Sequence, residues 1–138
     1  DAPPDGPPGH VWELWNYEVV EVFLLGENGH YLEVELGPHG HHLVLTLHGA
    51  RQISSRHPDI TYQTSRTDLR WSGEAILRRE LLPEGPLRAN AYRIGGTAPA
   101  RQYFAAYPSG GAQPDFHQLD TFKPILWRDV LASGAQDE

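Results

Sequence analysis

The 138-residue chain contains no cysteine and no methionine. Without cysteine it can form no disulfide, bind no metal through thiolates and offer no thiol nucleophile. Metal binding and covalent chemistry are therefore left to histidine and the carboxylates. No apolar run approaches the roughly 18 residues of a membrane helix, and a composition of 39% hydrophobic and 21% charged residues is typical of one soluble globular domain. We expect no membrane contact.

Lysine and arginine are missing from the first 50 positions, which carry eight acidic residues. Lysine occurs once, at Lys123, and the arginines concentrate between positions 51 and 101. The net charge is −7 and the pI is near 5.5. Because such a chain repels phosphate over most of its surface, we expect no nucleic-acid partner.

The chain begins with Asp1 rather than with Met, which indicates a processed or truncated piece. A mature secreted protein could begin in the same way. Of a cytoplasmic and a secreted location, we expect the cytoplasmic one.

Two strands joined by a tight turn are predicted between positions 18 and 36. Residues 18–25 are apolar and β-branched, and residues 26–29 (Gly-Glu-Asn-Gly) have strong turn chemistry. Residues 31–36 alternate cleanly, with aliphatic side chains at 32, 34 and 36 facing inward and Tyr31, Glu33 and Glu35 on the opposite face. We therefore expect an antiparallel hairpin.

Further short strands are predicted at residues 42–48, 69–77, 87–94 and 102–107, with a polar stretch of no clear pattern after Gly49. Helices are predicted only at 78–82 and 124–132. Short strands separated by Gly and Pro predict an all-β fold, an antiparallel β-sandwich. We expect a Pro/Gly-rich loop or linker at 1–12, one domain at 13–132 and a flexible tail at 133–138.

Three stretches, in order, carry a resemblance to a known family. They are residues 14–23 (Leu-Trp-Asn-Tyr-Glu-Val-Val-Glu-Val-Phe) with residues 31–40 (Tyr-Leu-Glu-Val-Glu-Leu-Gly-Pro-His-Gly), then Pro114-Asp115-Phe116-His117, then Phe122-Lys123-Pro124. Over roughly residues 10 to 127 the chain resembles the chromosome 4 open reading frame 33 homologues. That family in turn resembles type 9 carbohydrate-binding modules and the wider DOMON-like group. The resemblance implies a jelly-roll-like β-sandwich whose relatives bind sugars or haem.

The family has strands ahead of the Pro-rich loop, whereas this chain starts inside that loop. The resemblance therefore implies that the N-terminal strands are missing. A sandwich without them has an unpaired edge or an uncovered core, which pairing with another chain would relieve. Self-association through a sheet edge is the expectation.

Trp15 and Glu21 keep the spacing of two pocket residues in the related sugar-binding modules. The resemblance implies that Trp15 stacks on a sugar ring and that Glu21 accepts hydrogen bonds from its hydroxyls. Four residues are eligible as a second aromatic for the ring: Trp71, Tyr107, Phe116 and Trp127. The alternative interpretation places Trp15 in the core, with Glu21 bound to backbone or arginine.

Tyr31, Glu33 and Glu35 form a second group of candidate binding residues. Two carboxylates at positions i and i+2 of a strand lie about 7 Å apart, which is loosely compatible with a glycosidase pair. Because an exposed sheet face is normally polar, we expect a solvated or arginine-paired face here, with calcium or glycan contact as the alternative.

Histidines at positions 39, 41 and 42 raise the question of a metal or haem. No HExxH motif occurs, and no histidine pair matches the haem-binding relatives. We therefore predict neither metal nor cofactor, with His39 kept as a candidate ligand contact. His117 is expected to be an anchor, because burial of the adjacent Phe116 would pull its imidazole inward.

The sequence contains no P-loop, GxGxxG or GxSxG motif. The leading hypothesis for function is therefore a non-catalytic binding module. Its ligand is not identified by the sequence and could be a sugar or glycan. A metal-dependent or carboxylate-based hydrolase using Glu21, Glu33, Glu35 and His39 is one alternative. A protein-interaction module presenting a sheet edge is the other. Fold resemblance alone does not choose among them.

Overall fold

The computed structural model describes residues 1–111 and 115–125, and these residues contain strands and single 3-10 turns but no α-helix. The strands are β1 (Gly9–His10), β2 (Val19–Leu25), β3 (His30–Leu36), β4 (His41–His48), β5 (Ile53–Arg56), β6 (Thr61–Arg66), β7 (Trp71–Ile76), β8 (Arg88–Gly95), β9 (Gln102–Ala105) and β10 (Lys123–Pro124). The 3-10 turns are η1 (Leu14–Asn16), η2 (Glu27–Gly29), η3 (Arg79–Leu81) and η4 (Leu119–Thr121). The prediction of an all-β protein is confirmed.

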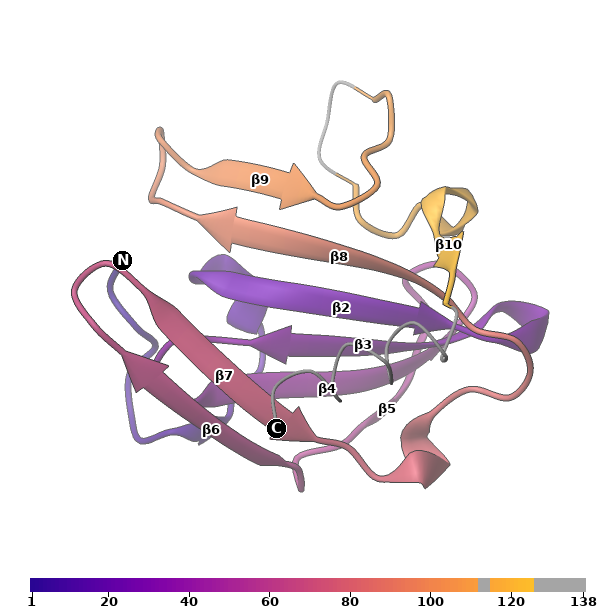
Figure 1. Cartoon of the computed structure of the whole chain (residues 1–138), viewed down its shortest axis with the longest axis horizontal. Coiled ribbons are helices and arrows are strands. Elements are labelled where there is room, and N and C mark those ends of the chain that lie inside the picture. The colour runs from indigo at the N-terminus through magenta and orange to yellow at the C-terminus, as the bar shows by residue number, and fades with distance from the viewer. Residues whose placement is uncertain (112–114, 126–138) are drawn as a thin grey trace, which may run out of the picture.

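One large sheet and one hairpin make up the architecture (Figure 1). The large sheet has the order β1-β4-β3-β2-β8-β10, with β5 added to β4 and β9 added to β8. Its pairings are antiparallel except for the parallel pair β1 and β4. The β6–β7 hairpin forms a separate two-stranded sheet in front of the large sheet in the view of Figure 1. This arrangement is consistent with a β-sandwich.

The β2–β3 hairpin has the predicted register. Phe23 pairs with Glu33 and Glu21 with Glu35, and the turn is closed by a hydrogen bond from the Gly26 N–H to the His30 carbonyl. Asn28 has a φ of 58°, in the left-handed region that asparagine tolerates better than most residues. The Gly-Glu-Asn-Gly sequence therefore sets the pairing of the two strands.

Both faces of the large sheet are covered. On the face toward the β6–β7 hairpin, the aliphatic positions of β3 pack with β4 and η3 in a cluster of Leu32, Val34, Val44 and Leu81. On the opposite face, called here the carboxylate face, a larger cluster includes Val19, Phe23, Leu43, Leu45, Leu47, Tyr92, Ile94 and Phe122. Segment 115–122 covers part of this face through Phe116, Leu119 and Phe122.

Several expectations outside the hairpin need correction. The polar stretch after Gly49 contains two strands, β5 and β6, whose mostly exposed side chains carry no apolar alternation. The predicted helix at 78–82 is a single 3-10 turn, η3. Most of the predicted helix at 124–132 and the whole tail at 133–138 lie outside the described residues. The N-terminal segment 1–12 includes β1, which joins the large sheet beside β4.

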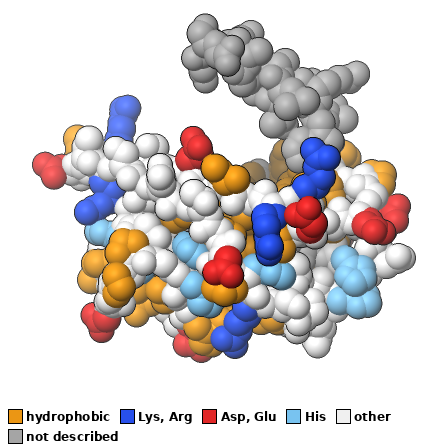
Figure 2. Space-filling view, turned by 90° about the horizontal axis from the view of Figure 1, so that it is seen from below, with side chains coloured by type: hydrophobic (Ala, Val, Ile, Leu, Met, Phe, Trp, Pro, Cys, Tyr) orange, Lys and Arg blue, Asp and Glu red, His pale blue; other side chains and the backbone are white. Residues whose placement is uncertain are grey.

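The edges of the large sheet are formed by strands of two or four residues: β1 and β5 on one side, β9 and β10 on the other. Short edge strands offer few backbone groups to another chain. Self-association through an edge stays a prediction. The face seen in Figure 2 shows basic and acidic side chains interspersed. Within the described part of the chain, no helix is long and apolar enough to cross a bilayer.

Candidate functional site: a cavity with a carboxylate floor

A cavity of about 330 Å³ opens on the carboxylate face of the large sheet. Glu21 of β2 and Glu33 of β3 lie at its floor, together with apolar residues of β4 and β8. The walls come from η1, from the loop after β4, from β9 and from segment 115–117. The lining residues are Trp15, Asn16, Glu21, Glu33, Leu45, Leu47, Arg51, Ile53, Ile94, Arg101, Tyr103, Asp115, Phe116 and His117.

Trp15 and Glu21 therefore face the same cavity. Trp15 lies on η1 and is half-buried, and Glu21, on the central strand β2, is 3% exposed. Arg101 holds η1 in place: its guanidinium donates to the backbone carbonyls of Trp15 and Tyr17. The half-buried Trp15 side chain both lines the cavity and packs against the larger core cluster.

Glu21, Glu33 and Glu35 form a cluster in which one carboxylate oxygen from each lies within 4.8 Å of the others. The strand register brings them together, because Glu21 is opposite Glu35 and Glu33 is two residues away on the same face. All three are at least 96% buried, Glu33 being 4% exposed and Glu35 0%. The expectation of a solvated or arginine-paired face is therefore wrong. Alternation placed the three on one face correctly, but it did not reveal that segment 115–122 covers that face.

Burial dominates the electrostatics of this cluster. Burial, followed by the negative charge of Glu33, raises the pKa of Glu21 to about 8, and burial raises the pKa of Glu33 to about 7. Burial, then the charges of the other two carboxylates, raise the pKa of Glu35 far above its ordinary value. The cluster therefore retains protons at neutral pH unless a cation compensates its charge.

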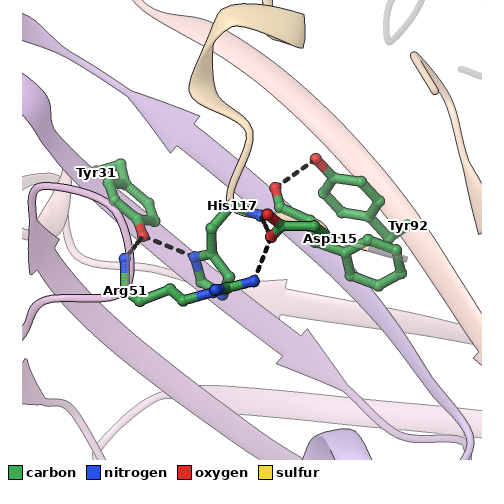
Figure 3. Close-up of polar contacts among 6 residues, drawn as sticks. Tyr31, Arg51, Tyr92, Asp115 and His117 are labelled. Atoms are coloured by element: carbon green, nitrogen blue, oxygen red, sulfur yellow. Dashed lines mark hydrogen bonds and ion pairs between the residues drawn. The ribbon is translucent and has the colours of Figure 1, made fainter. Parts of the chain in front are cut away.

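A hydrogen-bonded network stands beside the cavity (Figure 3). The buried hydroxyl of Tyr31 accepts from the backbone N–H of Arg51 at 2.9 Å and donates to Nδ1 of His117 at 2.7 Å. Asp115 accepts from the Arg51 guanidinium at 2.7 Å and from the backbone N–H of His117 at 3.0 Å. The network ties segment 115–117 to the loop after β4.

Aromatic contacts also hold segment 115–117 in place. The ring of Phe116 stacks on Tyr92 with centroids 3.9 Å apart, and the Tyr92 hydroxyl donates to the Phe116 carbonyl at 2.7 Å. His117 packs against Phe23, at 5.1 Å between ring centroids. The family-motif residues Asp115, Phe116 and His117 thus close one wall of the cavity, while Pro114 lies outside the described residues.

His39 lies away from the carboxylates. It does not line the cavity, and its Nε2 is 3.4 Å from a guanidinium nitrogen of Arg66. Among the aromatics proposed as a partner for Trp15, Phe116 lines the cavity, Trp71 and Tyr107 do not, and Trp127 is outside the described residues. Tyr31 does not line the cavity either, but its hydroxyl is hydrogen-bonded to two residues that do, Arg51 and His117.

The lining residues that sequence analysis did not propose include Arg51, Arg101 and Tyr103. Arg51 lies in the turn after β4 with a φ of 63°, Arg101 immediately precedes β9, and Tyr103 lies in β9. Nothing local marks them, because each reaches the cavity through contacts with segments distant in sequence. The concentration of arginine after position 50 was the one available signal.

Comparison with known proteins identifies the family. The chain is 43% identical to the UPF0462 protein C4orf33 homolog of Rattus norvegicus, over 93% of this chain and 68% of the rat protein. It is 40% identical to UPF0462 protein C4orf33 of Homo sapiens, over 93% and 68%, and 37% identical to the Danio rerio homolog, over 93% and 69%. The chain belongs to the UPF0462 C4orf33 family. The resemblance to the C4orf33 homologues is thereby confirmed, whereas the likeness to type 9 carbohydrate-binding modules and the DOMON-like group stays a prediction.

No protein-family model matches the chain. No solved structure matches it either. The names of the UPF0462 C4orf33 relatives state no ligand and no reaction. A function for the cavity must accordingly be argued from the residues that line it.

Proposed function

We propose that this protein is a non-catalytic binding module whose cavity takes a small polyhydroxylated ligand such as a sugar ring. One observation carries the proposal: Trp15 and Glu21, the two residues that match pocket positions of the sugar-binding modules, line one cavity. The volume of about 330 Å³ falls at the lower end of the range for small-molecule sites. That the protein is a jelly roll of the carbohydrate-binding-module kind rests on the sequence resemblance to type 9 carbohydrate-binding modules.

The lining suits a neutral, hydroxyl-rich ligand. The indole of Trp15 offers an apolar face, and Tyr103 and Phe116 supply aromatic rings on the other walls. A carboxyl group that is partly protonated near neutral pH can both donate and accept hydrogen bonds, which matches paired hydroxyls. Two guanidinium groups, from Arg51 and Arg101, add donors around the floor.

The test is a calorimetric titration against a panel of mono- and oligosaccharides at high concentration. One stacked ring and a few solvent-competed hydrogen bonds give millimolar to micromolar affinity, about −4 to −8 kcal/mol. We expect Trp15→Phe to retain part of the binding, Trp15→Ala to abolish it and Glu21→Gln to weaken it. Trp71→Ala, a half-buried tryptophan outside this cavity, is the matched control and should bind normally.

Two results would contradict the binding module. One is the absence of binding across the whole panel. The other is binding that Trp15→Ala leaves unchanged in a folded protein. Circular dichroism of each variant separates loss of the site from loss of the fold.

A second candidate is hydrolysis by a carboxylate pair, favoured by the approach of Glu21 and Glu33. Their oxygens lie within 4.8 Å, and both residues line the cavity. Retaining glycosidases place two carboxyl groups about 5 to 5.5 Å apart. Turnover of aryl glycosides by the wild-type protein, lost in Glu33→Gln, would favour this function over binding alone; Glu74→Gln on the exposed face of β7 is its control.

A further inference from the structure

We propose that Glu21, Glu33 and Glu35 together bind one divalent cation of the oxygen-preferring kind, with Ca²⁺ as the ion of best fit. This site is additional to the ligand pocket proposed above and stands or falls independently of it. In the sequence the histidines predict no metal, and calcium contact at Glu33 and Glu35 is expected only as an alternative.

The backbone fixes the geometry of the three ligands. β2 and β3 lie inside the large sheet with a paired strand on each side, so neither strand is free to move its glutamates apart. One oxygen from each residue lies within 4.8 Å of the others. Calcium binds oxygen at about 2.3 to 2.6 Å, so two of its ligands are separated by at most about twice that length. The cluster meets this limit.

The second observation is the state of Glu35. It is fully buried, and within residues 1–111 and 115–125 no backbone N–H, hydroxyl or basic side chain donates to its oxygens, so a proton shared with Glu21 or Glu33 is the hydrogen bond open to it. Ionised carboxylates cannot satisfy one another, because none has a proton to donate. An unpaired buried carboxylate is costly, so either shared protons or a cation must compensate the cluster.

Positive charge from the protein covers only part of this requirement. The ion pairs found within the described residues join Arg51 to Asp115 and Arg93 to Glu18, and neither involves the cluster. The charge of Arg101 acts on Glu21, but its guanidinium donates to backbone carbonyls. Three carboxylates, one arginine and one divalent ion would leave a local charge of zero.

Access and ligand type select the ion. Glu21 and Glu33 line the cavity, so solvent can deliver an ion to the cluster and water can complete its coordination. An all-oxygen set suits Ca²⁺, Mg²⁺ or Mn²⁺ rather than zinc or copper, which prefer nitrogen and sulfur. Calcium tolerates irregular coordination, whereas magnesium demands a near-ideal octahedron.

The experiment is a calorimetric titration of EDTA-treated, dialysed protein with CaCl₂, repeated in two buffers of different ionisation enthalpy. We expect one ion bound per chain, protons released on binding and a rise in the unfolding temperature. Glu35→Gln and Glu33→Gln should each weaken binding about 10- to 100-fold, the effect of losing one charge-assisted contact. Glu74→Gln should bind as the wild-type protein does.

The unfolding temperature in EDTA separates ligation from folding. Glu35→Gln should unfold no earlier than the wild-type protein in EDTA, while losing most of the stabilisation by CaCl₂. The proposal is overturned if millimolar CaCl₂, MgCl₂ and MnCl₂ each leave the heat and the unfolding temperature of the wild-type protein unchanged, which would mean a cluster compensated by protons. It is also overturned if Glu35→Gln and Glu33→Gln both bind Ca²⁺ with wild-type affinity.

Sugar titrations run in EDTA and in CaCl₂ separate this proposal from the binding function. Calcium binding without any sugar binding removes only the function proposed for the pocket. Sugar binding in EDTA with no response to calcium removes only the cation site.

Discussion

The Tyr31 hydroxyl donates to Nδ1 of His117 across 86 residues of sequence, at a distance of 2.7 Å. The same oxygen accepts from the Arg51 backbone N–H. One phenol thus joins strand β3 to two adjacent segments that line the cavity, the loop after β4 and residues 115–117. The stability of those walls depends on a group that contributes nothing to the cavity lining itself.

Tyr31→Phe should therefore destabilise the protein. The substitution keeps the buried ring but leaves two polar partners without a hydrogen bond, which costs about 1 to 3 kcal/mol. Urea unfolding followed by tryptophan fluorescence measures the change. Tyr107→Phe, at an exposed phenol, is the control and should change the free energy of unfolding by less than about 0.5 kcal/mol. Equal effects of the two substitutions would contradict the network.

His117 should make the protein acid-sensitive. Burial, followed by the nearby Arg51 charge, lowers the pKa of His117 from 6.5 to about 4. Between these values the unfolded chain binds a proton that the folded protein does not, so the free energy of unfolding falls as pH drops from 6.5 to 4. Urea unfolding across this range should show the loss, and His117→Gln should flatten it. His48→Gln, at an exposed imidazole of β4, should leave the profile unchanged.

Glu21 should produce the opposite dependence. Burial raises the pKa of Glu21 from 4.5 to about 8, so in EDTA the unfolded chain releases its proton first as pH rises. The free energy of unfolding should fall between pH 4.5 and 8, by at most about 1.4 kcal/mol per pH unit for one proton. Glu21→Gln should reduce this slope, with Glu33 and Glu35 responsible for what remains. A slope identical to that of the wild-type protein would show that Glu21 ionises freely.

Asn90 should prove a strong structural anchor. It is 2% exposed on β8, where its Nδ2 donates to the Tyr107 carbonyl and to Thr121 Oγ1, and its Oδ1 accepts from the Tyr107 N–H. Asn90→Ala should cost about 1 to 3 kcal/mol, because the N–H and carbonyl of Tyr107 and the hydroxyl of Thr121 lose a buried hydrogen-bond partner. Gln102→Ala, exposed on β9, provides the comparison in the same thermal-unfolding experiment. A loss no larger than that of Gln102→Ala would contradict this role.

The sequence by itself determined five of the longer strands and the antiparallel pairing of the β2–β3 hairpin, but not β1, β5 or β6. Alternation at residues 31–36 and the Gly-Glu-Asn-Gly turn are local signals, and β2, β3, β4, β7 and β8 lie within a few residues of their predicted positions. The same signals placed Tyr31, Glu33 and Glu35 on one face. The motifs around Trp15 and Asp115 identified the family.

Only the tertiary structure decided what that face does. Alternation distinguishes two sides of a strand but not which side another segment covers, since burial depends on residues far along the chain. Phe116 and His117 turn a face that looked solvent-exposed into a covered one, and Arg101 reaches the Trp15 carbonyl from 86 residues away. Glu21, Glu33 and Glu35 became a cluster because strand pairing opposes two of them, and tertiary packing buries all three even though Glu21 and Glu33 border the cavity. Their protonation is set by that burial, which no stretch of local sequence encodes.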